Sequence, residues 1–218
     1  MGRYSIGIQG LKKDETTQLE GQCDSEKLSV FSPDRDAIVP ILDDQWFEDD
    51  VVAQVTKLIE VVFGKSTLEE NLSFIESALG KKIRLYFAND YYEDHYKMYF
   101  KRPIYWMFAS PKGSFQALVY MHRYTPSTIG QILTKYLREY IEKINAKIGQ
   151  LEQSDRAADN RQADKYRAVV RELTDWERDV IYPLANERIS IDLDDGVKVN
   201  YNKFPHALVK VTGLSTWK

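Results

Sequence analysis

The sequence has little cysteine and no long apolar run. Cys23 is the only cysteine, so no intrachain disulfide can form, as is typical of proteins from a reducing compartment. No apolar stretch approaches the roughly 18 residues of a membrane span, and no charged segment followed by an apolar one opens the chain. These absences favour a cytoplasmic protein that makes no membrane contact.

Sequence motifs for cofactors, metals and covalent catalysis are also missing. The eleven glycines include no G-x-G pair, which excludes the usual glycine-rich phosphate loop. The histidines at 95, 122 and 206 are scattered and lack a second ligand at metal-binding spacing. The acidic run Asp192 to Gly196 departs from the calcium-loop pattern and reads as a turn. We therefore expect no catalytic residue, no cofactor-binding residue and no metal ligand in this chain.

Acidic residues are absent from His95 to Arg138, although the chain holds 33 of them. This acid-free window covers 44 residues and contains seven cations, namely Lys97, Lys101, Arg102, Lys112, Arg123, Lys135 and Arg138. It also contains ten aromatic residues, namely Tyr96, Tyr99, Phe100, Tyr105, Trp106, Phe108, Phe115, Tyr120, Tyr124 and Tyr136. Cations attract phosphates and aromatic rings stack on bases, so the window combines both ingredients of a nucleic-acid surface. The alternative is a half-buried β-hairpin whose aromatics belong to the core and whose cations are merely solvated.

The overall charge limits the first interpretation. The formal net charge is -3, and the chain outside the window carries 23 basic against 33 acidic residues, a balance of -10. A self-sufficient DNA-binding domain is usually basic throughout. The sequence instead predicts one basic face on an acidic body, as expected of one part of a larger assembly.

The first half of the chain predicts an irregular segment followed by a helical lobe, together spanning residues 1–100. Apolar residues recur at helical spacing from Val51 to Phe63, with Asp43 and Asp44 as candidate caps and Gly64 as the stop. A capping box at Ser66-Thr67 opens a second helix that ends at Gly80, and a less regular third helix covers 83–99.

The second half predicts two hairpins around a pair of long helices. Strand-like runs at 104–109 and 115–121 form a basic β-hairpin within 101–124. Thr125-Pro126 then opens an antiparallel helical hairpin at 125–188, and alternation around Asp194-Asp195-Gly196 indicates a short β-hairpin and tail at 189–218. The expected fold class is α+β and mainly helical.

Several stretches resemble a known family of proteins. These stretches are Lys101 to Phe108, Phe115 to Tyr124, Gly2 to Ser5, Ile41 to Asp44, Phe47 to Asp50 and Ile191 to Tyr201. Together they closely resemble the carboxy-terminal region of PglX, and they follow the family's order along essentially the whole chain. PglX proteins are adenine-specific DNA methyltransferases of the BREX phage-defence system, related to type IIG restriction-modification enzymes.

The resemblance implies a parent enzyme several times longer than this chain. Its S-adenosylmethionine site and its Asn-Pro-Pro-Tyr catalytic motif would precede the matching region. The seven prolines here are never adjacent, so that motif is absent and no residue of the methyl-transfer site can be assigned. The implied chain is a fragment or a split piece, and the remainder of the methyltransferase is an expected partner.

The role expected for such a piece is DNA target recognition or clamping. Double-stranded DNA is the expected ligand, and the candidate contacts are Lys97, Lys101, Arg102, Tyr105, Lys112 and Arg123. The alternative role is a protein-interaction module that docks other defence-system proteins, which the negative overall charge and the aromatic content favour.

Overall fold

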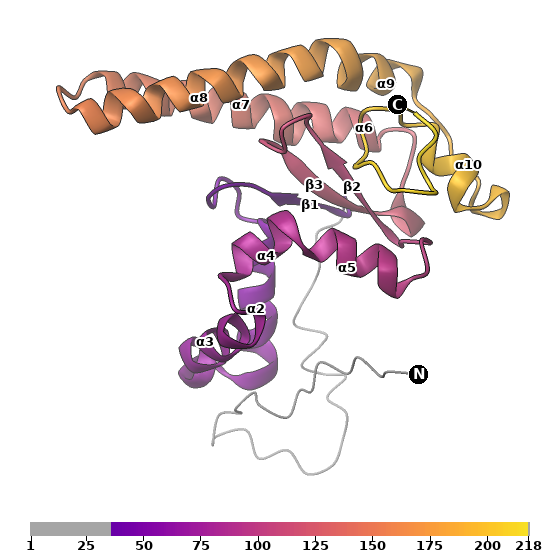
Figure 1. Ribbon diagram of the computed structural model, residues 1–218, viewed down its shortest axis with the longest axis horizontal. Coiled ribbons are helices and arrows are strands. Elements are labelled where there is room, and N and C mark those ends of the chain that lie inside the picture. Colours follow the sequence, from indigo (N-terminus) through magenta and orange to yellow (C-terminus); the bar gives the residue numbers. More distant parts are fainter. Residues whose placement is uncertain (1–35, 218) are drawn as a thin grey trace.

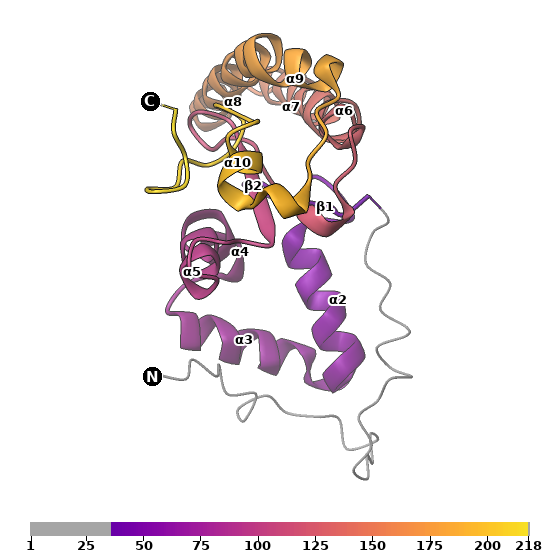
Figure 2. The same ribbon diagram turned by 90° about the vertical axis from the view of Figure 1, so that its right-hand side faces the viewer.

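The computed structural model describes residues 36–217 and consists of a small sheet between two groups of helices (Figure 1). The helical hairpin of α7 (Arg138–Glu152) and α8 (Ala157–Trp176) covers one side of the sheet. Helices α2 (Val51–Phe63), α4 (Ile83–Asn89) and α5 (Tyr91–Met98) lie on the other side, with α3 (Leu68–Leu79) farther from the sheet (Figures 1 and 2). The mainly helical α+β class is therefore confirmed. The predicted irregular start of the chain, including Gly2 to Ser5, falls largely outside the described residues.

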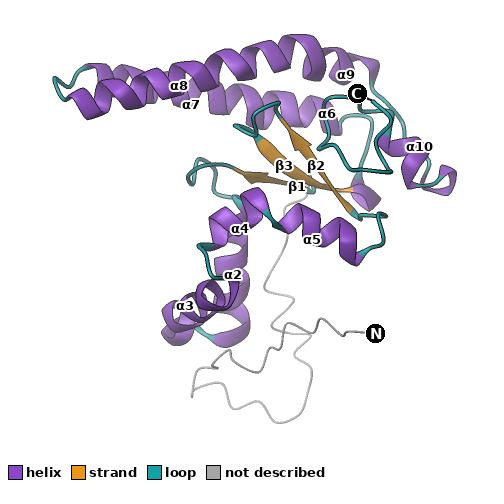
Figure 3. Ribbon diagram, viewed as in Figure 1, coloured by secondary structure: helices purple, strands orange, loops and turns teal. Residues whose placement is uncertain are grey.

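The sheet has three antiparallel strands in the order β1-β3-β2 (Figure 3). The predicted basic hairpin is present as β2 (Tyr105–Ala109) and β3 (Gln116–Tyr120), paired from Tyr105 opposite Tyr120 to Ala109 opposite Gln116. Strand β1 (Ile38–Ile41) pairs with β3 from the other side, which places β3 in the centre. Three consecutive residues of β3 are buried, because helices or loops cover both faces of the sheet.

The three helical segments predicted before the hairpin are confirmed, but their caps differ from expectation. Asp50, and not Asp43 or Asp44, caps α2, because its side chain accepts from the Val52 N–H. Asp43 instead accepts hydrogen bonds from the side chains of Trp46 and Tyr140. The predicted capping box of α3 is also wrong.

The Thr67 side chain at the start of α3 bonds to the preceding helix. The Thr67 hydroxyl donates to the Phe63 carbonyl across the preceding turn and makes no side-chain capping bond. The third helix is confirmed as two pieces, α4 and α5, which meet at Asp90.

The predicted antiparallel helical hairpin is confirmed, and its helices contain two π-helical segments. The first helix begins with α6 (Thr128–Gln131), passes through η4 (Ile132–Leu137) and continues as α7. It starts two residues after Pro126, because Thr125 and Thr128 bond each other in a preceding turn. The second helix continues from α8 through η5 (Glu177–Ile181) into α9 (Tyr182–Glu187). Pro183 lacks an N–H and stands at the start of α9, where a donor is not required, two residues after the π-helical segment ends.

The predicted C-terminal β-hairpin is wrong. Residues 193–195 form a 3₁₀ turn, η6 (Leu193–Asp195), and residues 197–201 form helix α10 (Val197–Tyr201). The alternating apolar residues misled the interpretation, because Val199 is 54% exposed while Tyr201 is fully buried. Tyr201 contacts Trp106 of β2 with ring centroids 5.0 Å apart, so tertiary packing and not strand pairing sets this segment. Within the described range, none of the helices is both long and apolar enough to cross a bilayer.

Candidate nucleic-acid interface

Most aromatic residues of the acid-free window belong to the core and not to a stacking surface. Trp106, Phe108 and Phe115 are buried, and Phe115 packs against the rings of Tyr140 and Trp176. The half-buried hairpin and the basic surface considered as alternatives are therefore both present in one element. The aromatic side chains pack in the core around the sheet, and the cationic side chains lie at the surface.

The seven cations of the window divide into two groups. Three form ion pairs with acids from outside the window, namely Lys97 with Glu93, Lys135 with Asp36, and Arg138 with Glu177. The other four are exposed and have no ion pair with any residue between 36 and 217; they are Lys101, Arg102, Lys112 and Arg123. Of the predicted DNA contacts, Lys97 is thus the one whose charge is locally compensated.

Three of the uncompensated cations lie at the open end of the β-hairpin. The Met121 N–H donates to the Ile104 carbonyl, which extends the strand pairing by one residue beyond Tyr105 and Tyr120. Arg102 lies two residues before Ile104, and Arg123 lies two residues after Met121, at the end of the 3₁₀ turn η3 (Met121–Arg123). We call Lys101, Arg102, Tyr105 and Arg123 the open-end cluster.

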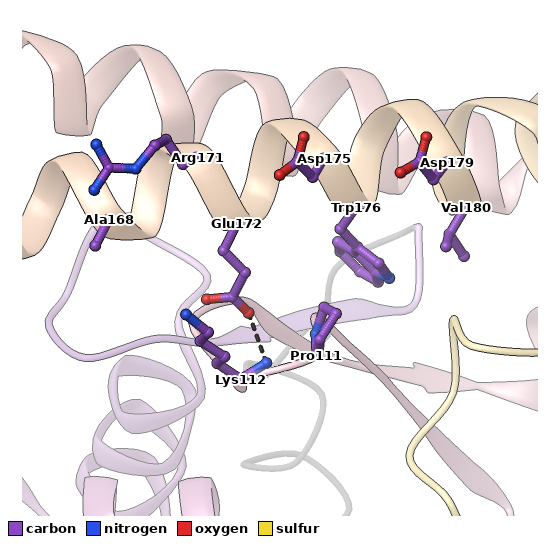
Figure 4. A pocket seen from close by; sticks show the side chains of 9 residues that line it. All are labelled: Pro111, Lys112, Ala168, Arg171, Glu172, Asp175, Trp176, Asp179 and Val180. Carbon is purple, nitrogen blue, oxygen red and sulfur yellow. Dashed lines mark hydrogen bonds between the residues drawn. The ribbon is translucent and has the colours of Figure 1, made fainter. Parts of the chain in front are cut away.

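Lys112 lies at the opposite, closed end of the hairpin, on the order of 15 Å away for strands of this length. The loop there is held by Glu172 of α8, which accepts hydrogen bonds from the Ser110 and Ser114 hydroxyls and from the Lys112 N–H. Figure 4 shows Glu172 pointing from α8 into this loop, while Asp175 and Asp179 point to the other side of the helix. The predicted site residues therefore do not form one continuous patch.

Tyr105 is held firmly between neighbouring rings. Its ring packs 5.2 Å from Tyr120 and 5.7 Å from His95, and its backbone N–H donates to Nε2 of His95 at 3.1 Å. Burial raises the pKa of the Tyr105 phenol, and the positive charge of nearby Arg123 partly offsets that rise. Tyr105 therefore presents an edge and a hydroxyl more than a free stacking face.

His95 should make the stability of this end pH-dependent. Burial lowers the pKa of His95, and Nε2 must be unprotonated to accept from Tyr105. A group whose pKa is lower in the folded state contributes stability above its unfolded pKa and loses it as the pH falls. The free energy of unfolding should therefore drop below about pH 6.5, by at most about 1.4 kcal/mol per pH unit. Urea denaturation at several pH values measures this.

Two variants give the control for that pH experiment. His95→Gln supplies an acceptor that does not titrate, so its curve should be flatter between about pH 7 and 5. His122→Gln removes an exposed histidine and should leave the slope unchanged. Equal slopes for the native chain and His95→Gln would contradict the assignment of the effect to His95.

The described residues offer no obvious place for a metal ion. No group of three or more His, Cys, Asp or Glu side chains between residues 36 and 217 is arranged to hold one. The arrangement at the open end can bind phosphate by charge, but nothing in it suggests proton transfer or nucleophilic attack.

Sequence reasoning counted Phe100, beside the open-end cluster, among the ten aromatic residues of the window but did not single it out as a DNA contact. Phe100 immediately precedes Lys101 and is 88% exposed, the highest value among the large apolar side chains of the described part. The sequence left open whether the aromatic residues of the window are exposed or buried. The backbone of Phe100, at the end of α5, is left-handed. No local sequence signal indicates that conformation.

Comparisons with known proteins agree with the resemblance to PglX. No protein-family model matches the chain. The chain is 38% identical over 243 aligned positions to the adenine-specific methyltransferase BrxX of Escherichia coli O9:H4 (strain HS), covering 99% of this chain and 20% of that protein. It is 37% identical over 220 positions to the adenine-specific methyltransferase PglX of Lacticaseibacillus casei (strain Zhang), covering 93% of this chain and 18% of that protein.

These matches identify the chain as homologous to a region of adenine-specific methyltransferases. More particularly, the resemblance to the PglX-like proteins of BREX systems is confirmed along nearly the whole chain. The chain spans about a fifth of the length of the relatives it matches.

Proposed function

We propose that this chain is a non-catalytic region, carboxy-terminal in its parent, of an adenine-specific DNA methyltransferase of phage defence. In this role it helps to hold duplex DNA while another part of the enzyme, which binds S-adenosylmethionine, methylates adenine at N6. Both relatives are adenine-specific methyltransferases, which supports the reaction, and the absence of the Asn-Pro-Pro-Tyr motif from this sequence supports the division of labour.

The observation that carries the proposal is the open-end cluster. Lys101, Arg102 and Arg123 are exposed, lie at one end of a rigid hairpin, and have no acidic partner within residues 36–217. Cations that are not already paired can release counterions from DNA, whereas paired ones contribute less. Phosphate contacts of this kind fix the position and orientation of the duplex without reading its sequence.

The proposed reaction needs such a surface. An adenine within a duplex must be extruded from the stack before a methyl group can reach N6, and extrusion costs unpairing and unstacking energy. Protein contacts to the flanking backbone hold the distorted duplex in place. The sheet that carries the open-end cluster is buried on both faces, which gives those contacts a rigid support.

Replacing Lys101, Arg102 and Arg123 with Ala should weaken DNA binding and its dependence on salt. The slope of log affinity against log salt should become shallower by up to about 2.7, at about 0.9 per lost phosphate contact, and affinity at moderate salt should fall roughly tenfold. Fluorescence anisotropy with a labelled duplex over a range of salt concentrations measures both quantities.

The window itself provides a matched control. A Lys97, Lys135 and Arg138 to Ala variant removes the same charge from the same window, but from cations that are already ion-paired. Its salt slope should stay close to that of the native chain. Equal slopes for the two triple variants would reject the open-end cluster as the DNA surface, and Lys112→Ala reports separately whether DNA reaches the closed end.

A second candidate function is docking to another protein of the defence system. It is favoured by the α7–α8 hairpin, whose far end extends past the sheet (Figure 1) and carries both signs of charge, such as Arg156, Arg161, Asp155 and Asp164. A surface of mixed charge suits a protein partner better than a polyanion. Co-purification of a BREX component without any shift of duplex DNA would favour this role over DNA holding.

A further inference from the structure

The end of α5 exposes apolar side chains at a point where the chain also bends sharply. Met98 is 62% exposed and Phe100 is 88% exposed, although both belong to a segment that leads directly into the core strand β2. Within the described residues the Phe100 ring has no aromatic partner. The exposed Phe100 ring therefore contributes little to the packing of the fold.

The backbone at Phe100 is one that normally requires glycine. Phe100 has φ 50° and Lys101 has φ 61°, both in the left-handed region. The Phe100 N–H donates to the Lys97 carbonyl and the Lys101 N–H to the Tyr96 carbonyl, which is the Schellman arrangement at a helix end. A side chain with a Cβ is disfavoured at this position, and glycine is the usual residue there.

The same chain ends another helix in the same way with glycine. At the end of α3, Gly80 has φ 66°, its N–H donates to Ser77, and the next N–H donates to Glu76. The two helix ends share their hydrogen bonds and differ in the residue at the left-handed position. Arg188 ends α9 in the same left-handed region, so this conformation does not strictly require glycine. The packing of the fold does not explain why the residue at position 100 is an exposed phenylalanine.

We propose that Phe100 stacks on an unpaired base of the DNA that the open-end cluster holds by its phosphates. The inference rests on the proposed DNA-holding function and adds a specific ligand group to it. Aromatic rings stack on all four bases, because every base has a π-face. Lys101 and Arg102 follow Phe100 directly, and the window around it contains no acid, so the charge here favours a polyanion over an acidic protein surface.

The structure also explains why the ring can reach a base. The left-handed turn directs Phe100 away from α5 and the sheet, which is what its exposure records. Arg102 and Arg123 stand at the hairpin end that this turn joins. A ring beside phosphate-binding cations is suitably placed to occupy the gap that an extruded base leaves in the stack.

The test compares two labelled duplexes, one perfectly paired and one with a single bulged adenine, in binding to the 218-residue chain. The native chain should bind the bulged duplex roughly tenfold more tightly, because stacking on an accessible base adds to the phosphate contacts. Phe100→Gly should abolish this preference while leaving the affinity for the paired duplex and its salt slope unchanged. The variant should also melt at an equal or higher temperature than the native chain, since glycine suits the turn better.

Two further variants separate the possible outcomes. Phe100→Leu keeps an apolar side chain and the strained turn but has no aromatic ring, so it should lose the preference, whereas Phe100→Trp should keep it. Absence of a preference in the native chain, or its survival in Phe100→Gly, would overturn the role of Phe100 and leave the cluster intact. The triple variant of Lys101, Arg102 and Arg123 should weaken binding to both duplexes equally, and failure of that result would reject the DNA-holding function itself.

Discussion

Asp50→Ala should lower the free energy of unfolding by about 3–5 kcal/mol, the cost of breaking a buried ion pair by removing one partner. Asp50 is only 1% exposed, and its two carboxylate oxygens accept from NH1 and NH2 of Arg84 at 2.8 and 2.9 Å. It also caps α2 through the Val52 N–H. The variant would leave the Arg84 guanidinium partly buried with only the Leu42 and Asp44 carbonyls as acceptors.

Urea denaturation of the native chain and two variants measures this effect. Asp44→Ala is the matched control, because among residues 36–217 its exposed side chain accepts only from the N–H of Gln45, and the change should stay within about 0.5 kcal/mol. Asp50→Asn keeps a capping acceptor but removes the charge, so its loss should be intermediate. A loss under about 1 kcal/mol for Asp50→Ala would show that Arg84 finds new partners at little cost.

The second large effect is expected where Glu172 of α8 accepts hydrogen bonds from the loop of the β-hairpin. Glu172→Ala removes an acceptor of three hydrogen bonds, from the hydroxyls of Ser110 and Ser114 and from the Lys112 N–H. Ser110 is buried, so its hydroxyl would lose its acceptor in a place where water has little access. Hydrogen bonds to a charged group contribute about 1.5–3 kcal/mol, and we expect a total loss of about 3 kcal/mol.

A neighbour on the same helix gives the control for that variant. Asp175→Ala removes an exposed carboxylate whose ion pair in the described part of the chain is with Arg178 across a helix turn, and its effect should be below about 0.5 kcal/mol. Glu172→Gln retains one acceptor oxygen and should lose less than Glu172→Ala. Similar losses of unfolding free energy for Glu172→Ala and Asp175→Ala would contradict the stabilising role of the Glu172 hydrogen bonds.

Much of the fold follows from patterns that are local in the sequence. The helices at 51–63 and 68–79 and the long helical pair were predicted because apolar residues recur at the helical period. The hairpin was predicted because two strand-like runs flank a loop with Pro111 and Gly113. Elements set by distant partners were not: β1 requires β3, some 80 residues away, and α10 requires the aromatic surface of β2.

The candidate site likewise combines features that are visible in the sequence with features that depend on tertiary contacts. The acid-free window located the uncompensated cations, because charge is visible in sequence. Which cations find an acid depends on tertiary contacts such as Lys135 with Asp36, and no local pattern reports them. Lys112 and Arg102 are both predicted DNA contacts, yet they lie at opposite ends of the hairpin, as the pairing from Tyr105 with Tyr120 to Ala109 with Gln116 shows.

The sheet has a further property that follows from the position of its C-terminal cover. One side of β2 pairs with β3, and on the other side the Ala109 N–H donates to the Ala207 carbonyl and the Val209 N–H to the Met107 carbonyl. The outer backbone of β2 is thus already engaged, so it offers no template on which a strand from a neighbouring molecule could add. This cover of the outer edge of β2 therefore disfavours self-association through this strand.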